Sequence, residues 1–179
     1  MGDKTAHFDF REFTCKCGCA TNRTKDELIF KMEDIYSYLD KTPDGVSAIY
    51  INSGYRCTKS SQSIPGAFVG DTHNLGIGCD FYAVKKDGVT KWSSYELAAI
   101  CEKLGFNGIG IITNHDVHAD LRTIENYANG HWFGNEINGD NDIKSFLSYL
   151  PKQKQETTNT EKHKIKIVFD GKTIYESEV

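Results

Sequence analysis

The 179-residue sequence lacks any apolar run near the roughly 20 residues needed to cross a bilayer, and its opening MGDKTAHFDF lacks the apolar core of a secretion signal. It also lacks a basic run. The 21 Lys and Arg against 25 Asp and Glu give a formal net charge of −4, which argues against a nucleic-acid-binding protein. We therefore expect a chain made in the cytoplasm, with no membrane span and no nucleic-acid partner.

Six cysteines are many for this length, yet they do not indicate a disulfide-bonded scaffold, because 39% of the residues are hydrophobic and can form one ordinary core. Cys15, Cys17 and Cys19 alternate in FTCKCGC, whereas the other three cysteines lie singly. Structural zinc sites usually pair their cysteines as CxxC, so this CxCxC spacing is a weak metal signal. We expect packed or reduced thiols here rather than a metal site.

The spacing of apolar residues predicts one domain over residues 1–150. Helical spacing predicts helices, and β-branched or aromatic runs predict strands. The predicted helices cover 24–42, 93–104 and, as a short element, 141–150, and the predicted strands cover 47–52, 75–84, 108–113 and 117–122. A loop is expected over 59–72, and Thr24 with Glu27 should cap the first helix. These elements predict an α+β fold, with helices behind a small antiparallel sheet.

The last part of the chain has a different composition. Residues 151–162 are polar and nearly free of apolar side chains, which is typical of a linker. Residues 163–179 alternate apolar and polar side chains around Asp170 and Gly171, a dipeptide typical of a two-residue hairpin turn. An isolated hairpin is only marginally stable, so we expect it to dock on the main domain, to self-associate with a second copy, or to belong to a longer module.

Two histidines and an aspartate have a spacing suited to a metal site. His73 and Asp80 lie seven positions apart in GDTHNLGIGCD, and Gly76 and Gly78 between them would allow a turn that brings both side chains together. His118 follows on a separate predicted strand. Two imidazoles and a carboxylate suit catalytic zinc, which lowers the pKa of a bound water and polarises a peptide carbonyl. Such spacing also arises by chance in chains without a metal.

Several motifs occur in a fixed order along the chain. SGYR at 53–56 is followed by GAFVGDTHNLGIGCD at 66–80, GIG at 108–110 and VHADLR at 117–122. This order resembles the zinc D-Ala-D-Ala carboxypeptidase family, whose pattern is SGYR, then S-x-H-x-x-G-x-A-x-D, then H-x-D near a strand end. The family includes peptidoglycan metallopeptidases and phage endolysins, and it shares a fold with the hedgehog signalling domain. The opening FDFREFTCKCGC is also similar, so the resemblance covers residues 8–132.

The resemblance implies roles for individual residues. It makes His73, Asp80 and His118 the ligands of one zinc ion. It makes Arg56 the group that binds a substrate carboxylate or orients the carbonyl, a role that suits the planar, permanently charged guanidinium. From the sequence alone, Arg56 could equally form a surface ion pair.

Three further residues are candidates for contact with the substrate. Ser53 and Tyr55 belong to the same motif as Arg56, although plain packing in a turn is the alternative. Trp132 could stack on a stem peptide at the rim of the cleft, or it could fill the core.

The chain departs from the family pattern at the position of the general base. Many relatives have Glu or Asp three positions before the last zinc histidine, and here that position is His115. An imidazole can accept a proton near neutral pH, so His115 is a candidate base, as is the neighbouring Asp116; either could also be a solvated turn residue. Asp120 shares a strand face with His118 and is expected to be its hydrogen-bond partner, or a base. Gly78 in place of the usual alanine should not abolish metal binding.

These features together predict zinc-dependent hydrolysis of a peptide bond in peptidoglycan stem peptides, by a D-Ala-D-Ala carboxypeptidase or an L-Ala–D-Glu endopeptidase of endolysin type. The protein would act on the cell wall during phage lysis or as part of a virion, or it would be one domain of a larger protein. The missing acid at His115 leaves an alternative, a non-catalytic zinc-containing module that binds the cell wall or serves as a phage structural component.

Overall fold

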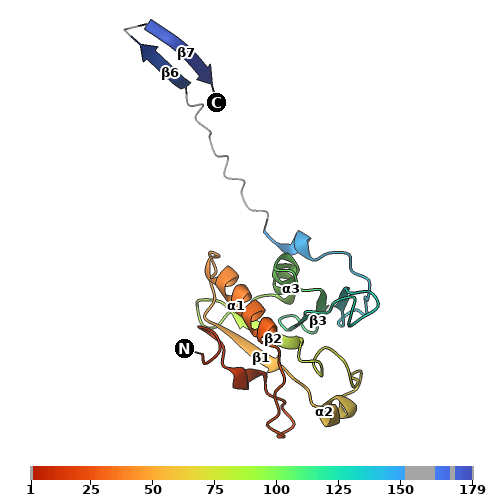
Figure 1. Cartoon of the computed structure of the whole chain (residues 1–179). Coiled ribbons are helices and arrows are strands. Elements are labelled where there is room, and N and C mark those ends of the chain that lie inside the picture. Colours follow the sequence, from red (N-terminus) through yellow and green to blue (C-terminus); the bar gives the residue numbers. More distant parts are fainter. Residues whose placement is uncertain (1, 152–163, 170–171, 179) are drawn as a thin grey trace.

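A computed structural model of the chain describes residues 2–151, 164–169 and 172–178. The predicted linker over 151–162 lies, apart from Pro151, outside the described residues, and so do the expected turn residues Asp170 and Gly171. Strands β6 (Lys164–Phe169) and β7 (Lys172–Glu178) pair antiparallel in a two-stranded sheet (Figure 1).

A five-stranded mixed sheet forms the centre of the main body. The strands are, in spatial order, β1 (Ala48–Ser53), β2 (Gly78–Val84), β4 (Val117–Asp120), β3 (Gly108–Ile111) and β5 (Trp132–Asn135). The first four are antiparallel neighbours, and β5 pairs parallel with β3. The sequence does not predict β5, because its four residues WFGN are too few to show an alternating pattern.

Two helices cover one face of this sheet (Figure 1). The buried residues of α1 (Asp26–Asp40) and α3 (Ser94–Lys103) join those of β2, β3 and β4 in one apolar core. The Cys79 thiol of β2, for example, lies 3.5 Å from the Met32 sulfur of α1. Side chains alternate between the two faces of a strand, so Asp80 and His118 face away from these helices. The predicted α+β fold with helices behind the sheet is confirmed.

The start of α1 differs from the prediction. The first helical residue follows Lys25, no side chain caps the helix, and the buried Thr24 hydroxyl has no hydrogen-bond partner. The reason is tertiary: the Lys25 N–H donates to the carbonyl of Gly76 at 2.8 Å, so the chain before α1 is held against the loop that precedes β2. The predicted Thr24–Glu27 capping box is therefore wrong. A capping box does form at α3, between Ser93 and Glu96.

Two short elements also differ from the prediction. The expected loop over 59–72 begins with a helical turn, α2 (Thr58–Ser63). The expected helix over 141–150 is reduced to the 3₁₀ turn η2 (Leu147–Tyr149), because the preceding Phe146 is buried and its N–H donates to the Glu102 carboxylate at 2.6 Å. Among the described residues, no helix is both long and apolar enough to cross a membrane.

The N-terminal segment packs beneath the loop that follows β1. It forms the 3₁₀ turn η1 (Phe10–Phe13), and Phe13 is fully buried. The Tyr55 N–H donates to the Phe13 carbonyl at 2.8 Å, and a Cβ at Gly54 would collide with the Phe13 backbone. Only glycine at position 54 allows the two segments to lie this close.

Candidate metal centre

Strands β2 and β4 place Asp80 and His118 directly opposite each other. The two residues are partners in the antiparallel register, and Asp80 Oδ1 lies 2.8 Å from His118 Nδ1. On its other side, His118 is opposite Gly110 of β3. Pairing of the strands is thus sufficient to bring the carboxylate and the imidazole together.

His73 reaches the same point from the loop before β2. Its Nε2 lies 3.2 Å from Asp80 Oδ1, and its Nδ1–H donates to the Gly54 carbonyl at 2.8 Å. Gly76, with φ of +74°, turns the loop, and a Cβ there would collide with the backbone of Arg23. Close packing of this loop against the chain before α1 therefore fixes where His73 points.

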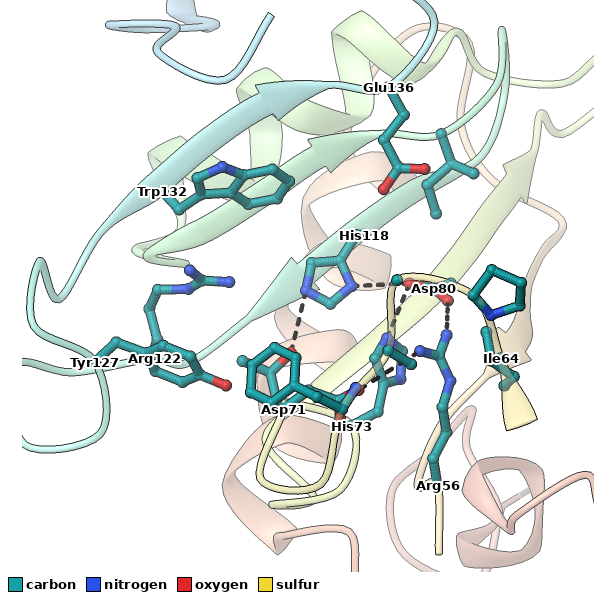
Figure 2. Close-up of a pocket in the computed structure, with 16 residues that line it drawn as sticks. Arg56, Ile64, Asp71, His73, Asp80, His118, Arg122, Tyr127, Trp132 and Glu136 are labelled. Carbon is teal, nitrogen blue, oxygen red and sulfur yellow. Dashed lines mark hydrogen bonds and ion pairs between the residues drawn. The ribbon is translucent and has the colours of Figure 1, made fainter. Parts of the chain in front are cut away.

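The ligand atoms of His73, Asp80 and His118 lie within 4.8 Å of one another (Figure 2). Two imidazole nitrogens and one carboxylate oxygen form a set that zinc favours, and three protein ligands leave a coordination position open. Each imidazole also has its other nitrogen bound to an oxygen acceptor, which directs the remaining nitrogen to the shared point. The residues present therefore fit a zinc ion.

Asp120 is fully buried behind His118. It accepts a hydrogen bond from His118 Nε2 at 2.9 Å and is held by Arg122 through Nε at 2.9 Å and Nη2 at 2.6 Å. Burial raises the pKa of Asp120, but the hydrogen bonds from His118 and Arg122 outweigh it and hold this pKa below its usual range. Burial likewise lowers the pKa of His118, but the hydrogen bonds to Asp120 and Asp80 raise it to about 9. An ionised Asp120 thus orients the imidazole of His118.

Two glycines leave room for this buried carboxylate. Gly78 and Gly108 are the cross-strand partners of Asp120 on β2 and β3. A Cβ at Gly108 would collide with the Asp120 carboxylate and with Arg122, and a Cβ at Gly78 would lie 2.7 Å from Thr72 Oγ1. Glycine at 78, where the resembled pattern has alanine, therefore has a steric cause in this chain.

Arg56 lies in the wall of the site beside Asp80. Its Nη2 donates to Asp80 Oδ2 at 2.8 Å, its Nε donates to Ser53 Oγ at 3.1 Å, and its Nη1 lies 4.0 Å from Asp71 Oδ2. The side chain is 18% exposed, so the ion pair belongs to the site and not to an open surface. Burial raises the pKa of Asp80, but hydrogen bonds from His118 and His73 lower it below its usual range.

A cavity of about 630 Å³ opens over the three convergent side chains (Figure 2). Trp132 covers one side, with its ring edge-on to His118 at a centroid distance of 6.4 Å, and Gly110 and Gly134 make space for the indole. Charged, aromatic and aliphatic groups share the remaining wall: Arg56, Ile64, Phe68, Asp71, Arg122, Tyr127 and Glu136. This size and mixed lining suit a small peptide ligand.

Five of the residues singled out from the sequence do not line this cavity: Ser53, Tyr55, His115, Asp116 and Asp120. The His115 ring donates a hydrogen bond from Nδ1 to the Trp92 carbonyl at 2.9 Å. Asp116 accepts a hydrogen bond from Asn52 Nδ2 at 2.6 Å. Tyr55 is buried on the side of the N-terminal segment. The hairpin thus turns His115 toward the segment before α3 and Asp116 toward strand β1.

Glu136 is an acidic residue of the cavity that sequence reasoning did not single out. It follows β5 directly, and its N–H donates to the Ile111 carbonyl at 2.8 Å. Figure 2 shows its carboxylate directed toward His118 and Asp80 from the side opposite Arg56. Glu136 comes near the site only because β5 pairs with β3, a parallel pairing that no local pattern announces.

Comparison with known proteins gave one family match. A family model described as Peptidase M15 matches residues 6–120. The matched segment contains Arg56, His73, Asp80 and His118, and it ends before Glu136. Searches of curated proteins and of solved structures found no match.

Proposed function

Because the chain belongs to the peptidase M15 family of zinc-dependent metallopeptidases, we propose that it hydrolyses a peptide bond in the stem peptides of peptidoglycan. We base this proposal on the convergence of His73, Asp80 and His118 at the floor of an open cavity, with Arg56 beside them. The motif order that resembles D-Ala-D-Ala carboxypeptidases supports the substrate class. Removal of a terminal D-alanine and cleavage of an L-Ala–D-Glu bond both fit this arrangement.

The ion would be held by His73 Nε2, Asp80 Oδ1 and His118 Nδ1. A zinc ion at such a site makes water more acidic and polarises the peptide carbonyl. The carbonyl of Gly54 and the carboxylate of Asp120 hold the two imidazoles in the orientation that binding requires.

Arg56 is the group for a carboxylate of the substrate. Its guanidinium lines the cavity next to Asp80, and a planar fork of donors pairs with a carboxylate through two hydrogen bonds. Ser53 Oγ accepts a hydrogen bond from the Nε of Arg56. Nη1 of Arg56, which lies 4.0 Å from Asp71 Oδ2, is then available to donate to a carboxylate of the substrate. Arg56 would therefore position the peptide so that its carbonyl faces the metal centre.

Glu136 acts as the general base in this proposal. Its side chain is exposed to the cavity, and within the described residues its carboxylate takes part in no hydrogen bond or ion pair. Glu136 accepts a proton from the attacking water and returns it to the amine nitrogen of the leaving group. His115 and Asp116 are the alternatives, and their hydrogen bonds to the Trp92 carbonyl and to Asn52 of β1, outside the cavity, count against them.

The direct test is mass spectrometry of peptidoglycan fragments after digestion, with and without a chelator. We expect release of D-alanine or of stem peptides that stops when zinc is removed. His73→Ala should lose both this zinc and the activity. Zinc-loaded protein that releases nothing from any stem substrate would contradict the proposal.

The role of Glu136 has its own test. Glu136→Gln should keep the zinc of the metal centre and lower kcat by about 10²- to 10⁴-fold, the range for loss of a general base. Glu125→Gln is the matched control, because Glu125 is an exposed glutamate that does not line the cavity. A wild-type rate in Glu136→Gln would transfer the role to His115 or Asp116, which His115→Ala and Asp116→Asn then separate.

A non-catalytic module that holds zinc and grips the cell wall is the second candidate function. It is favoured by one observation: the position three before His118, acidic in many relatives, is His115, and its ring bonds to the Trp92 carbonyl. Such a module would bind zinc and peptidoglycan without releasing fragments.

Action at the wall during phage lysis, in a virion or within a larger protein stays a prediction. A search for the chain in purified virions would test the virion alternative.

A further inference from the structure

A second group of metal-binding side chains lies away from the metal centre. Cys15, Cys17 and Cys19 follow η1, and Cys57 comes from the loop after β1. The four sulfur atoms lie within 4.8 Å of one another. Cys15 and Cys17 are 3.4 Å apart, and Cys17 and Cys57 are 3.6 Å apart. Four thiols thus meet at one point although one of them is far along the chain.

These separations suit four ligands around one ion. Zinc binds thiolate sulfur at about 2.3 Å in a tetrahedron, which places the sulfurs about 3.8 Å apart. All six cysteines are free thiols in the structure. The CxCxC spacing is unusual for zinc when taken alone, but Cys57 supplies a ligand that no local pattern can include.

The loop that carries the first three cysteines turns back on itself. The Cys15 N–H donates to the Thr21 carbonyl at 3.0 Å, which closes the loop. Gly18 and Ala20 both have positive φ, +84° and +56°, and alanine rarely adopts this conformation. Two such turns within a few residues bring the thiols of Cys17 and Cys19 to the same side.

Positively charged side chains lie around the four thiols, where they can offset the negative charge of a zinc–thiolate site. Four thiolates around Zn²⁺ carry a net charge of −2. Arg23 and Lys59 line the hollow around these thiols and can balance that charge. The Cys57 N–H, in addition, points to the Cys15 sulfur at 3.4 Å, which is the kind of backbone donor that stabilises a thiolate.

We propose that Cys15, Cys17, Cys19 and Cys57 bind a structural zinc ion, distinct from the zinc of the metal centre. On binding, the ion forms four Zn–S bonds and the thiols release their protons to solvent, with no change in oxidation state. The sequence favours packed or reduced thiols for the first three cysteines, and the position of Cys57 is what changes that interpretation.

This zinc would join the N-terminal segment to the loop that carries Arg56. Cys57 is the next residue after Arg56, and the Tyr55 N–H already donates to the Phe13 carbonyl. Gly54 in the same loop accepts the hydrogen bond of His73. The structural ion would therefore hold in place a loop that contacts the metal centre, without taking part in catalysis.

Metal analysis of the full chain tests the proposal. We expect two zinc equivalents in the wild type, one in Cys19→Ser and one in His73→Ala. With Co²⁺ in place of zinc, the thiolate-to-cobalt charge-transfer absorption should persist in His73→Ala and disappear in Cys19→Ser, because only the cysteine site has sulfur ligands. Cys101→Ala, which removes a buried cysteine outside the cluster, should keep two equivalents.

Three results would overturn it. One is a wild type that holds a single zinc, lost entirely in His73→Ala. Another is a cobalt-substituted protein without the thiolate absorption. The third is fewer than six free thiols in protein denatured without a reductant, which would show a disulfide where the zinc is placed. The spectrum of the wild type keeps the test valid even if a cysteine variant fails to fold.

Discussion

Replacing Asp120 with asparagine should weaken zinc binding at the metal centre. The carboxylate accepts from His118 Nε2 at 2.9 Å and from Arg122 Nη2 at 2.6 Å on the same oxygen, and from Arg122 Nε at 2.9 Å on the other. An amide keeps one oxygen and presents an N–H₂ group at the second position, where it faces another donor. We expect zinc affinity to fall about 10- to 100-fold, the usual cost of losing a partner of a ligating histidine, or about 1.4 to 2.7 kcal/mol.

The assay is competition for zinc with a chromophoric chelator, in a Cys19→Ser background so that only this site contributes. Thermal unfolding should show a second effect, a loss of about 3 kcal/mol, because Arg122 loses its negatively charged partner in a largely buried position. Asp116→Asn is the matched control, since Asp116 lies on the same hairpin and contacts Asn52 rather than a predicted ligand. A folded Asp120→Asn protein with unchanged zinc affinity would refute the view that this carboxylate orients His118.

Three further predictions concern the surroundings of the metal ligands. Gly76→Ala should lower both stability and zinc affinity, because φ at this position is +74° and a Cβ there would collide with a backbone carbonyl. Gly88→Ala is the control: φ is +76° there as well, but the space around it is open, so the substitution should cost only about 1 kcal/mol of stability. Gly78→Ala should lower the melting temperature, because the new methyl group would lie 2.7 Å from Thr72 Oγ1. Adding Thr72→Ala to this variant should recover part of the loss, because it removes that hydroxyl. If the effects of the two substitutions on stability simply add, the steric contact between the two side chains is not the cause. Adding zinc to metal-free protein should alter its tryptophan fluorescence, and Trp132→Phe should abolish that change, because this indole lies 6.4 Å from the imidazole on β4.

The sequence predicts those parts of the site that depend on neighbours along the chain. Seven positions and two glycines join His73 to Asp80, and strand alternation places His118 and Asp120 on one face. Both helices that back the sheet follow from apolar periodicity. The structure accordingly has these elements within a few residues of their predicted bounds.

Features that depend on distant pairing could not be predicted. Glu136 lines the cavity because β5 lies parallel to β3, and Cys57 joins the other thiols because its loop packs on the N-terminal segment. Thr24 has the residue type of a helix cap, but a main-chain bond to Gly76 outweighs that preference. In each case the deciding contact joins residues that no window of sequence contains together.

The hydrogen bond between His73 and Gly54 bears on how short this protein can be made. Gly54 rests on the backbone of Phe13, so His73 is aligned by a segment that contributes no ligand to the metal centre itself. A fragment that begins at α1 would retain His73, Asp80 and His118 and all five strands of the central sheet, although it would lack Cys15, Cys17 and Cys19. It would nonetheless lose the support beneath Gly54, and His73 would be free to turn away from Asp80. The smallest unit able to work as a peptidase is therefore longer at its amino end than the span of its ligands.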